Sequence, residues 1–165
     1  MMKKCTAVLF VLFVIVFCSS QLAHAGAASA SIKPRFLQAS LKSAGIASEL
    51  ILSSDTDFSR SLYIPGLNGS AVTIGFPAAG LLLGSPFLLE IDGVTALVTF
   101  TRDRKLEVVS GDSRIETVGA FGTVDCILSS VFGMVEDILK NVATLNILGI
   151  VSSVFTGVLN IIGCV

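Results

Sequence analysis

Residues 126–165 read CILSSVFGMVEDILKNVATLNILGIVSSVFTGVLNIIGCV, and this stretch decides the fold because its apolar side chains recur at helical spacing. They form one continuous apolar stripe, made of Ile127/Leu128, Val131/Phe132, Met134/Val135, Ile138/Leu139, Val142/Ala143, Ile147/Leu148, Ile150/Val151, Val154/Phe155, Val158/Leu159 and Ile161/Ile162. The opposite face is polar but carries only Glu136, Asp137 and Lys140 as charges. No transmembrane span is expected, because polar residues interrupt every window of about 18 residues in this stretch.

Two geometries are compatible with this amphipathic region. As one helix it would extend about 60 Å, which is too long for a domain of this size. It can break at residues 144–146 into a helical hairpin, or it can bend and lie along a sheet. Residue 145 is the midpoint between Cys126 and Cys164, and this coincidence favours the hairpin.

The N-terminal residues 1–25 have the pattern of a secretory signal peptide. Lys3 and Lys4 form its basic start, residues 7–17 its apolar run, and Ala23-His24-Ala25 a small-x-small cleavage site. The sequence therefore predicts a secreted, extracellular protein. Its mature part, residues 26–165, has about 140 residues, which is enough for one domain and too few for two.

Composition excludes several function classes for the mature part. The 165-residue chain is 53% apolar and 14% charged, which excludes a disordered protein. Its single histidine, His24, leaves with the signal, so Ser-His and Cys-His catalysis and histidine-ligated zinc are excluded. Loss of Lys3 and Lys4 leaves nine basic residues against twelve acidic ones, a net charge of −3, which disfavours nucleic-acid binding.

One carboxylate pair is a candidate for acid–base chemistry. Glu90 and Asp92 lie two residues apart, on one face of an expected strand. No histidine or further polar cluster accompanies them, and Gly93 follows directly. We therefore interpret the pair as a solvated strand edge, and we predict a protein that is not an enzyme and uses no cofactor or metal.

Two covalent features are expected in the mature part. Cys126 and Cys164 remain after the signal is removed, and a disulfide between them is expected in an oxidising compartment; the alternative is two buried free thiols. The tripeptide Asn68-Gly69-Ser70 is an N-glycosylation acceptor, and the preceding Pro65-Gly66 places it on a surface loop.

The part of the chain before the amphipathic region predicts an N-terminal arm and helix over 26–61 and antiparallel strands over 62–118. The helical spacing covers residues 36–51, although Gly45 interrupts it. The expected strands are 71–76, 87–101, 106–109 and 114–118. The charged residues 102–105 are interpreted as a solvated hairpin tip rather than an anion site. Together with the helices at 124–165, this predicts an α+β fold, a curled antiparallel meander packed against a long amphipathic helix or helical hairpin.

The segment from Ala79 to Asp112 resembles the PLUNC group of the BPI-like (TULIP) proteins. The apolar run 79–92 leads into the strand 94–100, and the "RDRKLEVVSGD" hairpin of residues 102–112 follows, as in that group. An amphipathic helix and a single disulfide follow there too. Two features differ: Ser113 stands where the family has a cysteine directly after the Gly-Asp turn, and the family pattern continues beyond the second cysteine with another strand. The resemblance thus implies a short or truncated member.

The resemblance implies a sheet wrapped around a long helix, with an apolar groove that takes lipid or spreads on a lipid or air–water surface, in epithelial or mucosal innate defence. Composition points the same way, because the apolar stripe and the uncharged strand faces exceed what one small core needs. The candidate lipid-binding residues are Leu97, Phe100, Phe132, Leu139, Val151, Phe155 and Leu159. An antimicrobial effect would act through lipid capture or surface activity, because Lys140 is the only basic residue on the polar face. The alternative is an interaction protein whose apolar stripe forms a homo-oligomer interface.

Overall fold

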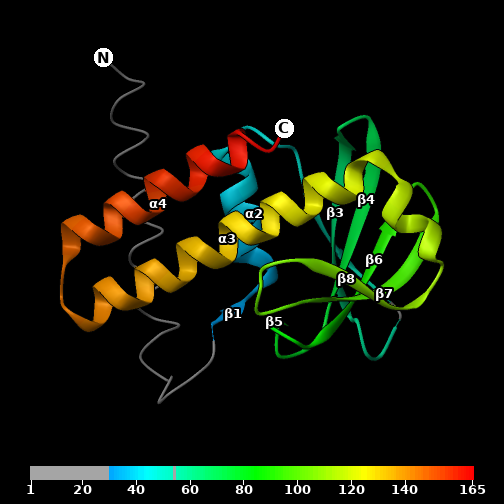
Figure 1. Cartoon of the computed structure of the whole chain (residues 1–165), viewed down its shortest axis with the longest axis horizontal. Coiled ribbons are helices and arrows are strands. Elements are labelled where there is room, and N and C mark those ends of the chain that lie inside the picture. Colours follow the sequence, from blue (N-terminus) through cyan, green and yellow to red (C-terminus); the bar gives the residue numbers. More distant parts are fainter. Residues whose placement is uncertain (1–29, 54) are drawn as a thin grey trace.

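Alternating apolar residues build a six-stranded antiparallel sheet in the computed structural model, which describes residues 30–53 and 55–165 (Figure 1). The sheet order is β2-β3-β4-β6-β7-β8. These strands are β2 Glu49–Leu52, β3 Arg60–Leu67, β4 Ser70–Phe76, β6 Pro86–Ile91, β7 Val94–Phe100 and β8 Leu106–Gly111. The predicted signal peptide, residues 1–25, lies outside the described residues.

One face of the sheet is buried in the core. In the register of the strands, Leu62 pairs with Ile74, Ile74 with Leu89, and Leu89 with Ala96, so their side chains share that face. All four side chains are at most 2% exposed. The other face carries half-buried residues such as Tyr63, Thr73 and Leu97.

The predicted single strand over 87–101 is wrong, because it is two strands joined by a tight turn. Asp92 and Gly93 have φ of 51° and 82°, and they connect Ile91 of β6 to Val94 of β7. Positive φ at both central residues is the geometry of the two-residue hairpin that Asp-Gly favours. Asn68 and Gly69 make the same kind of turn between β3 and β4, with φ of 48° and 81°.

The predicted strand over 114–118 is also wrong. Ser113–Thr117 form a short 3₁₀ helix, η1. The Asp112 carboxylate accepts a hydrogen bond from the Arg114 backbone N–H at 3.0 Å, which caps η1, and its ion pair with the Arg114 side chain closes the turn. The Ile115 side chain of η1 is fully buried. The apolar residue that suggested a strand therefore anchors η1 against the end of the sheet.

The predicted helix over 36–51 is only partly present. Helix α2, Pro34–Ser43, begins with proline at its first position and ends at a Schellman motif. In that motif Gly45 has φ of 80° and the Ile46 N–H donates to the Leu41 carbonyl at 2.9 Å. Residues 49–52 then form the edge strand β2, so strands begin before residue 62. A separate two-stranded sheet pairs β1 Ser31–Ile32 with β5 Leu81–Leu82, a pairing that the sequence pattern did not predict.

The C-terminal region is a helical hairpin, and the α+β prediction is confirmed. Helix α3, Gly119–Ala143, and helix α4, Ile147–Ile162, are joined at residues 144–146, where a hairpin was favoured. The N-terminal half of α3 covers the buried face of the sheet, where Phe132 stacks on Phe100 with ring centroids 5.0 Å apart. The rest of α3 and all of α4 extend away from the sheet, with α4 packed on α3 and α2 (Figure 1). None of the helices in the described part of the chain has the length and apolar character that crossing a membrane requires.

Candidate functional site

Helix α4 has three sectors, which follow from a turn of about 100° per residue. A narrow sector is buried against α3 and α2 and consists of Ile150, Val154, Gly157 and Ile161. A polar sector of about 120° contains Gly149, Ser152, Ser153, Thr156 and Asn160. The remaining sector of about 120° is apolar, and we call it the apolar face: Ile147, Leu148, Val151, Phe155, Val158, Leu159 and Ile162.

One small residue of the buried sector, Gly157, allows α4 to lie close to α3. A Cβ atom added to Gly157 would lie 2.6 Å from the Met134 Sδ and 2.7 Å from its Cβ, so only glycine allows this approach. The disulfide between Cys126 and Cys164 fastens the end of α4 to α3, with a Cα–Cα distance of 5.7 Å. The structure thus contains the pairing expected from the sequence. The hairpin therefore fixes which side of α4 is covered.

Side-chain hydrogen bonds fix the turn of the hairpin. The Asn146 side chain caps α4 by accepting a hydrogen bond from the Gly149 N–H at 3.0 Å. The Asn141 amide donates to the Ser153 hydroxyl at 3.2 Å across the two helices. With the disulfide at the other end, both ends of the hairpin are anchored and α4 cannot rotate freely about its axis.

The apolar face is consequently turned outward. Leu148 is 82% exposed, Phe155 66% and Leu159 50%. Ile147 and Ile162 are exposed as well, while Val151 and Val158 are half-buried. Helix α4 contains no charged residue. An uncharged helix that is apolar on both its buried and its exposed sides is unusual at a protein surface, because such helices are normally enclosed.

The structure does not bring the seven predicted lipid-binding residues together into one lining. Phe100 and Phe132 are fully buried in the core. Leu97 lies on the opposite face of the sheet from Phe100, because side chains alternate along β7. Leu139 is half-buried on α3. Val151, Phe155 and Leu159 belong to the apolar face of α4, so only these three share a surface.

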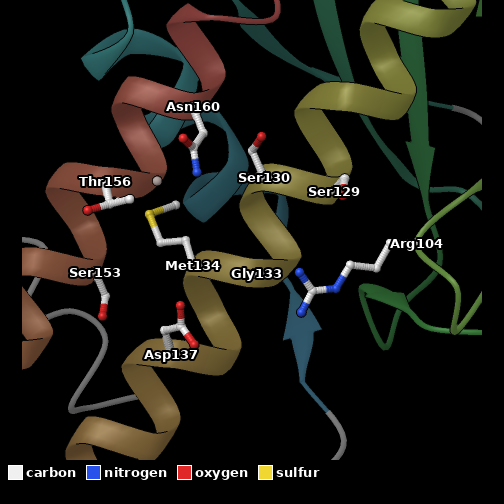
Figure 2. A pocket seen from close by; sticks show the side chains of 10 residues that line it. Arg104, Ser129, Ser130, Gly133, Met134, Asp137, Ser153, Thr156 and Asn160 are labelled. Carbon is white, nitrogen blue, oxygen red and sulfur yellow. The ribbon is translucent and has the colours of Figure 1, made fainter.

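Neither of two cavities that flank the helices in the described part of the chain is an apolar groove large enough for a lipid tail. The larger, of about 220 Å³, lies between α3, α4 and Arg104 at the tip of the β7–β8 hairpin (Figure 2). Its wall is mainly polar: Ser129, Ser130, Asp137, Ser153, Thr156 and Asn160 line it with Arg104, Gly133, Met134 and Gly157. The smaller lies between α2 and the hairpin, is lined mostly by apolar side chains, and measures about 20 Å³. That volume holds about one water molecule and no lipid tail.

The charged residues 102–105 form an exposed hairpin tip, as interpreted from the sequence. One of them, Arg104, is anchored, since its Nη2 contacts the Glu136 Oε2 of α3 at 2.7 Å. A Cβ at Gly133 would lie 3.1 Å from the Arg104 Nη1, so the missing side chain at Gly133 leaves room for the guanidinium beside the helix. A second tie comes from the Asp125 carboxylate, which accepts a hydrogen bond from the Leu106 N–H at 2.7 Å.

Glu90 and Asp92 do not share a strand face. Glu90 lies in β6, whereas Asp92 is in the β6–β7 turn and its carboxylate accepts a hydrogen bond from the Ala71 N–H at 2.9 Å. Hydrogen bonds from the Ser70 side chain and the Ala71 backbone lower the pKa of Asp92 below its usual value. The Asp92 carboxylate thus has a structural role, because it binds the backbone of the neighbouring strand β4.

The predicted glycosylation acceptor Asn68 lies at the exposed tip of the β3–β4 turn. Its Nδ2 is 3.5 Å from the Gly119 carbonyl oxygen at the start of α3. The surface location expected from Pro65-Gly66 is confirmed, and whether Asn68 carries a glycan stays a prediction.

Comparison with known proteins gave no match to a family model, to a curated protein or to a solved structure. The resemblance to the PLUNC group therefore stays a prediction. Sequence reasoning missed Leu148 and Ile162 as members of the exposed face. Their spacing of seven residues on either side of Phe155 was the available signal.

Proposed function

We propose that this chain is a secreted lipid-binding and surface-active protein, and that α4 lies in the boundary between water and hydrocarbon. The observation that carries the proposal is the exposed, uncharged apolar face of α4. A helix with one apolar and one polar side lies in the plane of an interface and buries its apolar side to a depth of about 5–10 Å.

The energetic reason is the apolar area that the fold leaves in water. Fully burying a side chain of the size of leucine or phenylalanine contributes about 1.5–3 kcal/mol. Leu148, Phe155 and Leu159 are each half exposed or more, and they follow one another along a single helix. Contact with hydrocarbon would recover most of this free energy in one step.

The proposed contact is a surface and not an internal groove. Phe100 and Phe132 fill the core, and the apolar cavity beside α2 is too small for a lipid tail. The apolar face, in contrast, needs no rearrangement to contact a bilayer or an air–water surface. Because α4 carries no basic residue, the attraction would be hydrophobic and would not depend on anionic lipid.

Secretion and a part in mucosal innate defence belong to the same proposal. The signal-like residues 1–25 and the disulfide between Cys126 and Cys164 support an extracellular protein. Any antimicrobial action would then follow from coating or capturing lipid. The proposal includes no enzymatic activity and no cofactor.

Vesicle flotation tests the proposal. The protein should float with vesicles of neutral phosphatidylcholine, and replacing half of the lipid by anionic phosphatidylglycerol should change the bound fraction by less than about twofold. The double variant Phe155→Ser/Leu159→Ser should lose at least tenfold in vesicle affinity. Leu52→Ser is the matched control, because Leu52 is 85% exposed but lies on the sheet edge.

Two results would contradict the proposal. One is no flotation of the natural protein at micromolar concentration. The other is equal loss of binding in the double variant and in the Leu52→Ser control.

A further inference from the structure

The apolar face of α4 has a symmetry that lipid binding does not require. Its central members are Leu148, Val151, Phe155, Leu159 and Ile162. Counted from Phe155, they lie at −7, −4, 0, +4 and +7 along the helix. The pattern of these five positions therefore reads the same in both chain directions, whereas Ile147 and Val158, at −8 and +3 on the edge of the face, have no apolar counterpart. A two-fold axis beside Phe155 would exchange the two halves of the five-residue set.

We propose that in water a second copy of this chain covers the apolar face, with the two α4 helices antiparallel and Phe155 on the two-fold axis. A two-fold interface uses the same patch on both copies, so the patch must be complementary to itself. Here Leu148 of one copy meets Ile162 of the second copy, and Val151 meets Leu159. Phe155 meets Phe155, and aromatic pairs are favourable in stacked or edge-to-face arrangements.

Charge also favours a second copy over a different protein. The apolar face and the rest of α4 contain no charged residue that would select a partner of opposite charge. Antiparallel α4 helices bring opposite ends of the helix dipoles together. The border of the face on its polar side is formed by Ser152 and Thr156, which are small and exposed, so two helices can approach closely.

The size of the patch sets the strength of the pair. Helix α4 has 16 residues and is about 24 Å long. Over this length the apolar face presents its five central side chains. At about 80 Å² each, they bury roughly 400 Å² per copy. The total area buried by both copies stays below the roughly 1,200 Å² that is typical of stable complexes. The dimer is therefore weak and reversible. The dimer would bury the apolar face in water and dissociate when hydrocarbon competes for that face.

Cysteine cross-linking tests the geometry. In Phe155→Cys the new thiol lies on the axis and should give a disulfide-linked dimer under mild oxidation. In Leu148→Cys alone the thiols lie far apart, so cross-linking should be at least tenfold slower. A mixture of Leu148→Cys with Ile162→Cys protein should give the mixed dimer. Mass spectrometry of each product should show the bond between Cys126 and Cys164 retained.

Sedimentation velocity of the natural protein gives a second measurement that needs no substitution. Between about 1 and 200 µM the protein should shift from monomer to dimer, and Phe155→Ser should stay monomeric. Adding phosphatidylcholine vesicles should slow the Phe155→Cys cross-link severalfold.

Two outcomes would overturn the dimer. One is a single monomeric species over the whole concentration range; the other is a Leu148→Cys cross-link as fast as that of Phe155→Cys. The experiments can refute the dimer and the lipid contact independently of each other. Flotation with vesicles and no cross-linking would remove only the dimer, whereas cross-linking without flotation would remove only the proposed function.

Discussion

Two phenylalanines of the same helical stripe have opposite surroundings. Phe132 of α3 is fully buried and stacks on Phe100 of the sheet, with ring centroids 5.0 Å apart. Phe155 of α4 is 66% exposed. Both stand at regular apolar positions of the sequence, so periodicity alone does not separate them. What differs is the covering element: the sheet lies under the first half of α3, whereas Phe155 lies on the side of α4 that is turned away from α3 and α2.

The largest expected effect is a difference in the free energy of unfolding between variants of these two phenylalanines. Phe132→Ala should lower the free energy of unfolding by about 3–5 kcal/mol, because it leaves a cavity between sheet and helix. Phe155→Ala should change it by less than about 0.5 kcal/mol at a concentration where the protein is monomeric. Urea unfolding followed by circular dichroism measures both. Losses of similar size in the two variants would show that Phe155 is covered.

Removing the disulfide tests whether α4 depends on its fastening to α3. In Cys126→Ser/Cys164→Ser a closed loop with a sequence separation of 38 is opened. The expected loss is about 4 kcal/mol in the chain-entropy treatment. Amide hydrogen exchange should accelerate in α4 far more than in β4 and β6. Unchanged protection in α4 would contradict the view that the disulfide fixes its orientation.

A pair of glycine substitutions sharpens the same comparison within the hairpin. Gly157→Ala should destabilise by about 1–3 kcal/mol, because the new methyl group has no room beside Met134. Gly122→Ala, at a helical site with open space around it, should stabilise by up to about 1 kcal/mol. Thermal unfolding of both variants gives the signs. Stabilisation by Gly157→Ala would mean that α3 and α4 pack less closely.

The smallest expected effect is on the pH dependence of folding stability, and it comes from Asp92 in the sheet region. Its pKa is lowered in the folded protein by hydrogen bonds from Ser70 and Ala71. The carboxylate therefore stabilises the fold above the ordinary aspartate pKa near 4, and this contribution is lost as the pH falls through the lowered value. Asp92→Asn, which also tolerates the positive φ of this turn, should reduce the difference in stability between pH 6 and pH 2. An unchanged difference would remove Asp92 as a source of acid sensitivity.

Local signals in the sequence predicted part of the fold well. The helical hairpin at 144–146 and the bond between Cys126 and Cys164 followed from periodicity and from cysteine positions within one region. The strand over 106–109 followed from its position after a charged turn. These features depend on neighbouring residues and need little knowledge of the rest of the chain.

The missed elements depend on turn chemistry and on distant contacts. Asp92-Gly93 is a hairpin signal that was hidden inside a long apolar run. The pairing of β1 with β5 joins segments about 50 residues apart, which no periodicity encodes. The expected groove mixed residues of the core with residues of the surface, because an apolar stripe gives no information on what covers it. Only the structure shows that Phe155 and Leu159 are exposed and that Phe100 and Phe132 are not.

The contact between α4 and hydrocarbon can be measured directly with one fluorescent side chain. The chain contains no tryptophan, so Phe155→Trp introduces a single reporter on the apolar face. With phosphatidylcholine vesicles its emission should shift to the blue, and lipids brominated along their tails should quench it. Val109→Trp, at a position 56% exposed on β8, is the control that should show neither change. An unshifted, unquenched Phe155→Trp, or equal quenching at both positions, would contradict the account.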